Sequence, residues 1–178
     1  MEEQVILVDQ DDQQIGVMEK MKAHYSGSLH RAFSVFIFNT KGELLLQQRA
    51  LNKYHSPGLW TNSCCSHPRP GEKTLDAAHR RLEEEMGLNC LLTYGFHFTY
   101  QASFSNELIE HEFDHVFFGL TDLMPVPNAD EVASFKYINL ESLAVELQQS
   151  PTNYSAWLNI CFPKMVEFKH KTYGFLDN

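Results

Sequence analysis

Two glutamates in an apolar stretch are the residues whose spacing most directly indicates chemistry. Glu110 and Glu112 lie two positions apart in a run rich in Phe and Val, which is typical of a β-strand. Because side chains alternate across a strand, both carboxylates point to the same face. Two like charges beside aromatic residues are electrostatically unfavourable unless a cation lies close to them. The pair therefore predicts a metal ion or another positive group nearby.

A second group of carboxylates follows two arginines on a predicted helix. Glu83–Glu85 follow Arg80 and Arg81, with Leu82 between them. The i,i+4 pairs Arg80–Glu84 and Arg81–Glu85 can be exposed ion pairs, each of which stabilises a helix by about 0.2–0.5 kcal/mol. Alternatively, the glutamates can hold Mg²⁺, which prefers carboxylate oxygens. The preceding loop, His67–Glu72, favours the second alternative, because it can bring another carboxylate to the charged face.

Histidine and cysteine are the other residue types that could do chemistry. The chain has nine histidines, but a single histidine is more often a hydrogen-bonded surface or core residue than a metal ligand. The four cysteines, at positions 64, 65, 90 and 161, do not form the C-x-x-C spacing of zinc ribbons and thioredoxin-type sites. We therefore expect free thiols, which are most often small buried hydrophobic residues.

Hydrophobic periodicity predicts the elements that must position these groups. Strands are expected at Val5–Val8, Phe33–Phe38, Leu44–Leu46, Phe96–Phe104, Ile109–Thr121 and Ser134–Ile138, with a hairpin turn at residues 39–42. Helices are expected at Thr74–Gly87, with Thr74 as N-cap and Gly87 as stop, at Leu140–Gln149, with Asn139 as cap, and from Tyr154 to about His170, where Pro163 should break or kink the helix. This order predicts an α+β fold with an antiparallel or mixed sheet, in a single domain over residues 1–178.

Composition limits the possible functions and partners. The 178 residues carry 14 Lys and Arg against 23 Asp and Glu, and the resulting net charge of −9 argues against a nucleic-acid partner. The apolar stretches are far shorter than the roughly 20 residues of a membrane-spanning helix, and the acidic start, Met1–Gln4, lacks the basic region of a signal peptide. We therefore expect a cytoplasmic protein with no membrane partner. An anionic substrate would need a local basic patch or a bound metal, because the overall charge repels it.

The segment Ser66–Leu88 resembles a Nudix box. The matching positions are Glu72, Arg80, Leu82, Glu84, Glu85 and Gly87. Two positions depart from the pattern: Ser66 replaces the first glycine of the box, and Arg81 replaces a glutamate that Nudix hydrolases use to hold metal. A divergent box of this kind, together with the stretch Trp60–Pro68 before it, resembles the type I isopentenyl-diphosphate isomerases. These enzymes have a Nudix-like fold and do not hydrolyse their substrate.

This resemblance covers most of the chain and implies a set of site residues. The residues implied for a site that holds Mn²⁺, Zn²⁺ or a similar ion are His24, His30, His67, Glu110 and Glu112. The basic residues implied to bind the substrate's diphosphate are Lys20, Arg49, Lys53 and Arg81. Glu85 would help to hold a separate Mg²⁺ that bridges to the same diphosphate.

The implied reaction moves a carbon–carbon double bond through a tertiary carbocation. Such chemistry needs an acid, a base across a flat substrate, a dry cavity and an aromatic face. By the resemblance, Cys65 lies on one side of the substrate, Glu112 with Tyr100 lies on the other, and Trp157 faces the cation. On composition alone, Trp157 and Tyr100 are equally typical of a hydrophobic core.

Two other classes of function stay open. A Nudix hydrolase of a nucleoside diphosphate derivative would use Glu72, Glu84 and Glu85 to bind the metal that activates water. A metal-binding or regulatory module without catalysis would use the same His/Glu cluster.

The remaining histidines expected to be structural or surface residues are His55, His79, His97, His115 and His170. We expect a monomer whose partner is a small allylic or homoallylic diphosphate.

Overall fold

A computed structural model describes residues 3–104 and 107–173 of the chain. Its strands are β1 (Gln4–Val8), β2 (Gln14–Glu19), β3 (His30–Phe38), β4 (Leu44–Arg49), β5 (Trp60–Thr61), β6 (Cys64–Ser66), β7 (Leu92–Ser103), β8 (Ile109–Leu120) and β9 (Val132–Ile138). Its helices are α1 (Lys20–Ser26), α2 (Thr74–Met86), α3 (Leu140–Gln149) and α4 (Ala156–Tyr173), with a 3₁₀ turn at Pro151–Asn153. In these two ranges no helix is long and apolar enough to cross a membrane. The predicted α+β class is confirmed.

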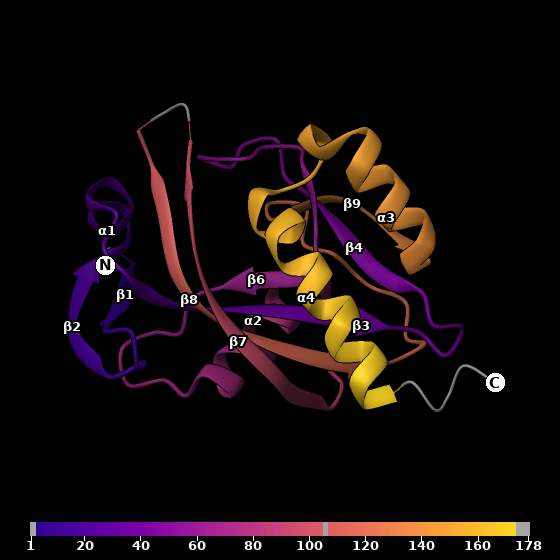
Figure 1. Ribbon diagram of the computed structural model, residues 1–178, viewed down its shortest axis with the longest axis horizontal. Coiled ribbons are helices and arrows are strands. Elements are labelled where there is room, and N and C mark those ends of the chain that lie inside the picture. Colours follow the sequence, from indigo (N-terminus) through magenta and orange to yellow (C-terminus); the bar gives the residue numbers. More distant parts are fainter. Residues whose placement is uncertain (1–2, 105–106, 174–178) are drawn as a thin grey trace.

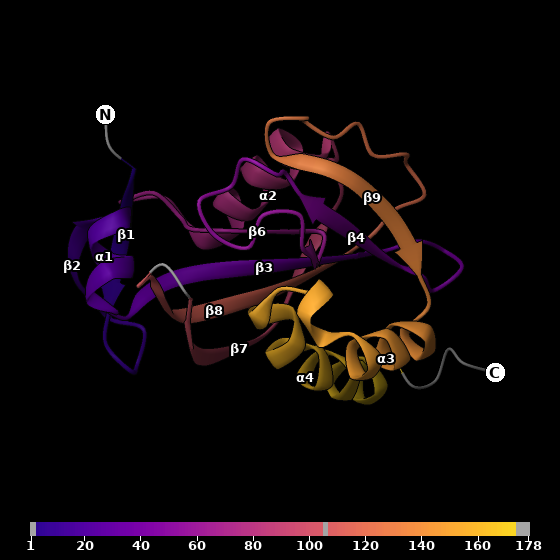
Figure 2. The same cartoon turned by 90° about the horizontal axis from the view of Figure 1, so that it is seen from above.

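The strands form one mixed sheet that lies between two helical layers (Figures 1 and 2). Alternation along β3 explains this arrangement. Phe33, Val35 and Ile37 belong to the core cluster of α2, whereas Phe36 and Phe38 belong to the cluster of α3 and α4. A strand that is covered on both faces is apolar along its whole length, as β3 is. The two helical layers therefore bury opposite faces of the same strand.

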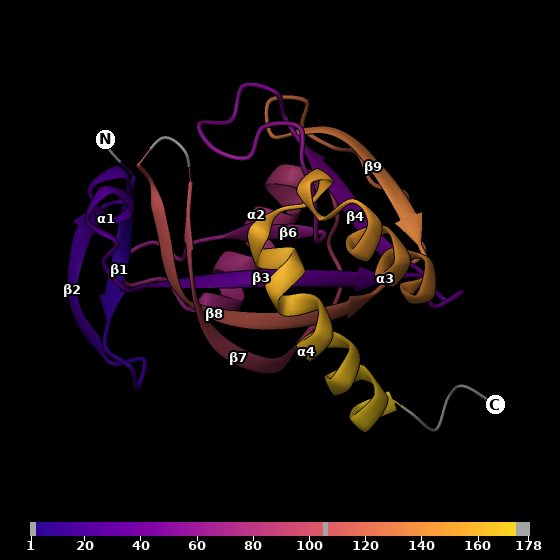
Figure 3. The ribbon, with the colours of Figure 1, turned by 45° about the horizontal axis from the view of Figure 1, so that its top comes forward.

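Strand register brings the polar residues together at one end of the sheet. β3 and β8 run parallel with His30 opposite Glu112, and β7 runs antiparallel to β8 with Tyr100 opposite Glu112. On the other edge of β3, Cys65 of β6 lies opposite Ser34. Residues opposite one another in neighbouring strands share a face of the sheet. Histidine, glutamate and tyrosine therefore meet at the end of β3 that pairs with β1. Figure 3 shows that end of β3 beside β1.

The predicted hairpin is confirmed at its turn but not along its strands. Phe38 and Leu44 are the only β3–β4 residues that pair. Beyond them β4 turns away to pair with β5 and β9, while β3 pairs with β6 and β8. Both strands are almost entirely apolar and buried, so the local pattern identifies strands without identifying their neighbours.

The helix ends agree in part with the predicted caps. Asn139 caps α3, and its side chain accepts a hydrogen bond of 2.7 Å from the Ser142 N–H. Gly87 follows α2 in the left-handed conformation, at φ 62°. The cap predicted at Thr74 is wrong, because Thr74 is already the first helical residue and Lys73 occupies the N-cap position. The short elements α1, β2, β5 and β6 have too few residues for a clear periodicity and were not predicted.

Helix α4 continues through Pro163, so the expected break does not occur. Proline has no N–H and therefore removes one intrahelical hydrogen bond. Leu158, Phe162 and Met165, on the same helix, are buried in the core cluster against the sheet. Burial of each such side chain contributes about 1.5–3 kcal/mol, which outweighs the lost hydrogen bond.

The C-terminal end of α2 is tied to the segment before β9. The Val126 N–H donates to the Met86 carbonyl at 2.8 Å, and the Asn128 N–H donates to the Glu85 carbonyl at 2.9 Å. A Cβ atom at Gly87 would lie 2.7 Å from the Val126 carbonyl oxygen. Both the left-handed backbone and this close approach require glycine at position 87. Together these contacts hold Glu85 in a defined position.

We expect Gly87→Ala to destabilise the protein more than Gly42→Ala. Gly42 is also left-handed, at φ 77°, but no atom lies within 4 Å of the position of an added Cβ, so its substitution should lose only about 1–2 kcal/mol. Gly87→Ala should lose about 1–3 kcal/mol more through crowding against Val126. Urea unfolding followed by circular dichroism measures both, and equal losses would contradict the proposed constraint.

Candidate active site and metal centre

Four buried side chains from four different segments converge on one point. His24 lies on α1, His30 begins β3, His67 follows β6 and Glu112 lies on β8. One ligand atom from each lies within 4.8 Å of all the others. The three imidazole rings have centroids 5.0–5.7 Å apart. The structure therefore brings together four of the five side chains that were expected to hold a transition-metal ion.

Backbone carbonyls set the orientation of two of these rings. His24 Nδ1 lies 2.7 Å from the Lys20 carbonyl oxygen, and His30 Nδ1 lies 2.8 Å from that of Ser28. A carbonyl only accepts, so each Nδ1 carries the hydrogen and each Nε2 presents a lone pair. Both Nε2 atoms are buried and lack a hydrogen-bond partner among the described residues. Buried nitrogen donors of this kind beside a carboxylate fit a divalent cation.

A tyrosine links the two glutamates of β8. Tyr100 Oη lies 2.7 Å from Glu112 Oε2 and 3.1 Å from Glu110 Oε2. The other oxygen of Glu112 lies 2.9 Å from His67 Nε2 and 3.6 Å from His30 Nε2. All five side chains are buried. Glu112 is therefore held on both sides, by a hydroxyl and by imidazoles.

Burial and hydrogen bonding shift the pKa values of the two carboxyls in opposite directions. Burial acts to raise the pKa of Glu112, but the hydrogen bond from His67 and the adjacent His30 imidazole outweigh it and hold this pKa well below its usual range. Burial, and then the charge of Glu112, raise the pKa of Glu110 well above its usual range. Without a cation, the negative charge of the pair is therefore concentrated on Glu112, and Glu110 holds its proton to a higher pH than an ordinary glutamate. A bound cation would favour ionisation of both.

His55 is buried in this site, although its sequence context predicted a structural or surface role. Its Nε2 lies 3.2 Å from Glu110 Oε1. One ligand atom from each of His24, His55 and Glu110 lies within 4.8 Å of the other two. Glu110 therefore belongs to a second group, which shares His24 with the first. The irregular loop that carries His55 has no periodicity from which its burial could be predicted.

One cavity collects almost all of the expected site residues. Its lining comprises Lys20, Gln47, Arg49, Lys53, Tyr54, His55, Cys65, Ser66, His67, Arg81, Glu85, Tyr100, Glu110, Glu112, Glu131 and Trp157. The expected residues outside this lining are His24 and His30, whose rings lie against that of His67. The lining residues that the sequence did not indicate are Gln47, Tyr54, His55, Ser66 and Glu131. Ser66 begins the Nudix-like box, and the other four come from strands or loops with no recognisable motif of their own.

Cys65 and Cys64 face different surroundings. Cys65 is half-buried and lines the cavity, whereas Cys64 is fully buried in the core cluster of α2. Burial raises the pKa of the Cys65 thiol well above its usual range, so the group is protonated at neutral pH. All four cysteines are free thiols, as predicted.

A network of basic and acidic side chains lines another part of the cavity. Arg81 Nη2 lies 2.6 Å from Glu85 Oε1 and 3.3 Å from Glu131 Oε1. Lys53 also pairs with Glu131. Gln47 Nε2 donates to the second oxygen of Glu85 at 2.8 Å. Two cations and two carboxylates are thus held together beside the cavity, so an anion that displaced a carboxylate would meet positive charge that is already in place.

Trp157 has a polar anchor and a cation on its ring. Its Nε1–H donates to Asn62 Oδ1 at 3.1 Å. The Arg49 guanidinium lies over the ring, 5.2 Å from a ring centroid. The His55 ring meets it edge-on, with centroids 5.9 Å apart. This indole is therefore already in a position where its π-face accepts positive charge.

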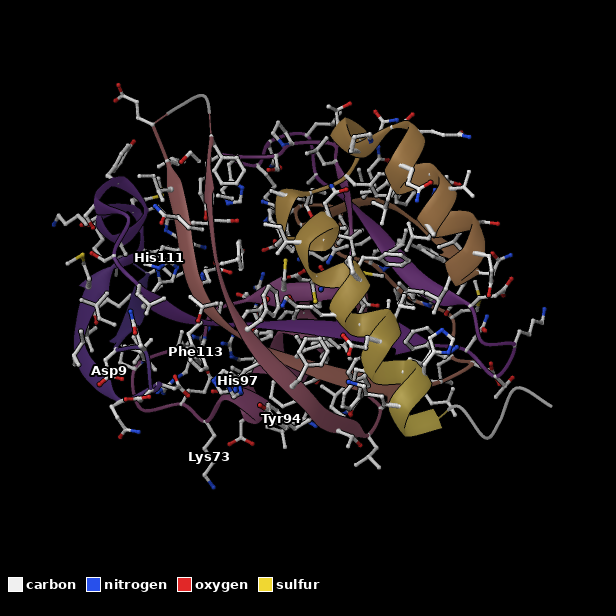
Figure 4. The ribbon with its side chains drawn as sticks, viewed as in Figure 1. Asp9, Lys73, Tyr94, His97, His111 and Phe113 are labelled. Carbon is white, nitrogen blue, oxygen red and sulfur yellow. The ribbon has the colours of Figure 1, made fainter. Side chains whose placement is uncertain are left out.

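Two histidines that Figure 4 labels lie outside the cavity lining. His97 stacks on Phe113 with ring centroids 4.9 Å apart, and its Nδ1 lies 2.8 Å from the Tyr94 hydroxyl. His111, between the two glutamates of β8, has its Nδ1 3.0 Å from the Gly27 carbonyl oxygen. This contact joins β8 to the end of α1. Both histidines therefore support the strands that carry the site.

The glutamates of a hydrolytic Nudix site do not gather in this cavity. Both oxygens of Glu72 bind Arg80, at 2.7 and 2.8 Å. Glu84 lies between Arg80 and Arg81, at 3.2 and 2.8 Å. Of the three glutamates, Glu85 alone lines the cavity. The predicted i,i+4 pairs are formed, and they engage the carboxylates that a hydrolase would need for metal.

Comparison with known proteins agrees with this geometry. A NUDIX domain model matches residues 28–158. Isopentenyl-diphosphate Delta-isomerase 1 of Aromatoleum aromaticum is 56% identical over 166 residues, which cover 93% of this chain and 94% of that protein. Isopentenyl-diphosphate Delta-isomerase of Pectobacterium atrosepticum is 52% identical over 165 residues, covering 93% and 92%.

Solved structures with lower sequence identity share the fold. A crystal structure of a Deinococcus radiodurans protein has a TM-score of 0.77 at 18% identity and covers 91% of this chain and 98% of its own. The MutT protein of Methanosarcina mazei has a TM-score of 0.65 at 19% identity, covering 82% and 96%. With the domain match and the likeness over nine-tenths of its length, the chain belongs to the NUDIX family and, within it, to the isopentenyl-diphosphate Delta-isomerases.

Proposed function

We propose that this chain converts isopentenyl diphosphate reversibly into dimethylallyl diphosphate by a 1,3-proton shift. The observation that carries the proposal is that one cavity holds a protonated thiol, a Tyr–Glu pair and a basic network. Cys65 lies on β6 and Glu112 on β8, and β3 separates these two strands. Two proton-transfer groups held on separate strands can address the two carbons of a flat allylic unit from different directions.

The proposed reaction adds one proton and removes another. Protonation of the terminal methylene breaks the double bond and leaves a tertiary carbocation. Removal of a proton from the carbon on the diphosphate side forms the new double bond, so no proton is gained or lost overall. Cys65 serves one of these steps, and Glu112, hydrogen-bonded to Tyr100, serves the other. The Trp157 ring, which already receives the Arg49 guanidinium, stabilises the cation between the two steps.

The histidines and glutamates at the end of β8 are proposed to hold one divalent ion, Mn²⁺ or Zn²⁺. The proposed ligands are His24, His30, His67, Glu110 and Glu112. When bound, such an ion offsets the negative charge of the two buried carboxylates and keeps Glu112 ionised. Tyr100 hydrogen-bonds Glu112 Oε2, the oxygen that does not contact His30 and His67.

The basic network is proposed to bind the diphosphate. Lys53 and Arg81 share Glu131 as a partner, and Lys20 and Arg49 also line the cavity. Glu85, held by Gln47 and Arg81, would share a Mg²⁺ with the diphosphate. Arg81 replaces a metal-binding glutamate of the Nudix box. The basic network is therefore proposed to bind phosphate and not to activate water.

Several broader properties belong to the same proposal. The chain is proposed to act as a single domain and as a monomer in the cytoplasm, with a small diphosphate as its partner and no nucleic acid or membrane partner. The hydrolase alternative is disfavoured because Glu72 and Glu84 are engaged by Arg80 away from the cavity. A non-catalytic metal-binding module is disfavoured by the thiol and the basic network beside the metal site.

Incubation with isopentenyl diphosphate in D₂O tests the activity itself. We expect dimethylallyl diphosphate that carries deuterium from solvent, because the added proton comes from a group that exchanges with water. Nuclear magnetic resonance identifies the product and the labelled carbon. Release of inorganic phosphate without isomerisation would contradict the proposal and favour the hydrolase.

Substitutions should separate proton transfer from diphosphate binding. We expect Cys65→Ala and Glu112→Gln to lower kcat by several orders of magnitude, since each removes a group that transfers a proton. Lys53→Ala should mainly raise KM, since it removes a diphosphate contact. Steady-state kinetics measures both constants. An increase in KM alone for all three variants would contradict these roles, and intact turnover in the first two would refute them.

Metal binding should stabilise the protein by an amount that depends on pH. Addition of Mn²⁺ or Zn²⁺ at about 100 times its Kd should raise the free energy of unfolding by about 2.7 kcal/mol. Burial is the main cause that lowers the pKa of His67 to about 4. Without metal, the unfolded chain therefore takes up a proton at His67 between about pH 6.5 and 4 that the folded chain does not, and stability falls as pH falls through this window.

The ring of His67 also stays neutral through this window, whereas Glu110, whose pKa is raised, must lose a proton when it binds the ion. The gain from metal should therefore shrink as pH falls towards about 4. Thermal unfolding with and without the ion measures this gain. His67→Gln should abolish it, whereas His170→Gln, at an exposed position on α4, should retain it. A gain that grows as pH falls in the unmodified protein would contradict the assignment.

A further inference from the structure

His55 is a buried histidine of the cavity that the proposed reaction leaves without a role. Its exposed fraction is 6%. Its ring stacks on Phe104, with centroids 5.1 Å apart, and meets Tyr54 and Trp157 edge-on, at 4.4 and 5.9 Å. Aromatic contacts on three sides leave this ring little freedom to turn. Its Nε2 therefore has a fixed direction, and the carboxylate that it meets is Glu110, at 3.2 Å.

The surroundings of His55 differ from those of the three clustered histidines. His24 and His30 each place Nδ1 against a backbone carbonyl, which leaves the Nε2 lone pair for a metal. His55 Nδ1 instead lies 3.4 Å from Ser56 Oγ, and a hydroxyl can donate to it. An ionised Glu110 only accepts, so the hydrogen of a neutral His55 ring belongs on Nε2. A ring with its hydrogen on that atom is a donor to Glu110.

The positions of the rings agree with this difference. His24, His30 and His67 each have ring centroids within 5.7 Å of the other two. The His55 centroid lies 6.2 Å from that of His24, and His55 is absent from the four-residue group that includes Glu112. His55 therefore lies beside the clustered histidines and reaches the site through Glu110.

We propose that His55 is a positioning residue for the metal centre, which orients the Glu110 carboxylate by donating a hydrogen bond from Nε2 to Oε1. This inference rests on the proposed metal site of the isomerase. The Oε1 atom of Glu110 is then held by His55, and its Oε2 atom lies beside Tyr100, 3.1 Å from Oη. Contacts to both oxygens fix the orientation of the Glu110 carboxylate. They also keep Tyr100 in its position beside Glu112. Ligand-orienting hydrogen bonds of this kind commonly change metal affinity about 10–100-fold.

The test compares two substitutions with different donor capacity. His55→Leu keeps bulk and removes the N–H, whereas the amide of His55→Gln places an N–H near the position of Nε2. Metal-free protein is titrated with Mn²⁺ alone, without substrate, and the Kd is measured by electron paramagnetic resonance. We expect His55→Leu to weaken Mn²⁺ binding about 10-fold or more, and His55→Gln to stay within about threefold of the unmodified protein. His170→Gln is the matched control and should bind normally.

Steady-state kinetics and Co²⁺ spectra complete the test. His55→Leu should lower kcat at saturating metal, with KM for isopentenyl diphosphate nearly unchanged, because the basic network is intact. The visible spectrum of Co²⁺ in His55→Gln should match that of the unmodified protein. If His55→Gln binds Mn²⁺ as weakly as His55→Leu and alters the Co²⁺ spectrum, His55 is a direct ligand and the proposal is overturned. Unchanged Mn²⁺ binding in His55→Leu overturns it equally.

Two further outcomes are distinguishable. If His55→Leu does not fold, His55→Asn replaces it, since its shorter amide does not reach Glu110 and the same 10-fold loss is expected. Failure of the unmodified protein to bind Mn²⁺ would refute the metal site itself. Normal binding by the unmodified protein with no difference among variants would refute only the role of His55, and the proposed isomerase would stand.

Discussion

Two carboxylates buried side by side are the constraint around which this structure is organised. Glu110 and Glu112 point to the same face of β8 and are almost fully removed from water. An isolated ionised carboxylate in such surroundings is strongly unfavourable. Hydrogen bonds from an imidazole and a tyrosine hydroxyl reduce the free-energy cost of burying the pair. The opposite pKa shifts of the two carboxyls, which concentrate the negative charge on Glu112, reduce it further. A divalent ion at this point would allow both to ionise, which explains why so many donors converge there.

The sheet provides the rigidity that this arrangement needs. β8 lies between β3 and β7, and its register fixes His30 and Tyr100 on either side of Glu112. The same face of these strands continues into an aromatic core that includes Phe36, Phe118 and residues of α4. Polar residues at one end and packed aromatic rings at the other share a single set of strands. The site is therefore positioned by the core itself, whereas His55 depends on a loop.

The acidic character of the chain has a local explanation in this geometry. The net charge of −9 argues against an anionic substrate only if charge is spread evenly. Glu85, Glu110 and Glu112 line a cavity that also contains Lys53 and Arg81, so positive and negative groups are concentrated where a metal and a diphosphate would bind. Arg81, at a position where the Nudix pattern has a glutamate, adds a positive charge to this cavity. In the proposed function, Arg81 of α2 thus favours phosphate binding over water activation.

The sequence alone determined the elements with strong periodicity and the residues carried by recognisable motifs. Helices α2 and α3, the strands β3, β4, β8 and β9, and the family resemblance of the segment Trp60–Leu88 all depend on patterns within a few neighbouring residues. Such patterns report local conformation and motif identity. Once the motif had indicated the family, the resemblance also implied ligands that lie far apart in the chain. Most of these side chains do line one cavity.

Only the tertiary structure decided which segments lie beside one another. The divergence of β3 from β4, the continuation of α4 through Pro163, and the places of His55, Gln47 and Glu131 depend on contacts between residues distant in sequence. Periodicity carries no information on such contacts, because the free energy that decides them comes from burial against partners elsewhere in the chain. For His55 this difference is complete: its neighbours in sequence indicate a loop, and its neighbours in space are a carboxylate and three aromatic rings.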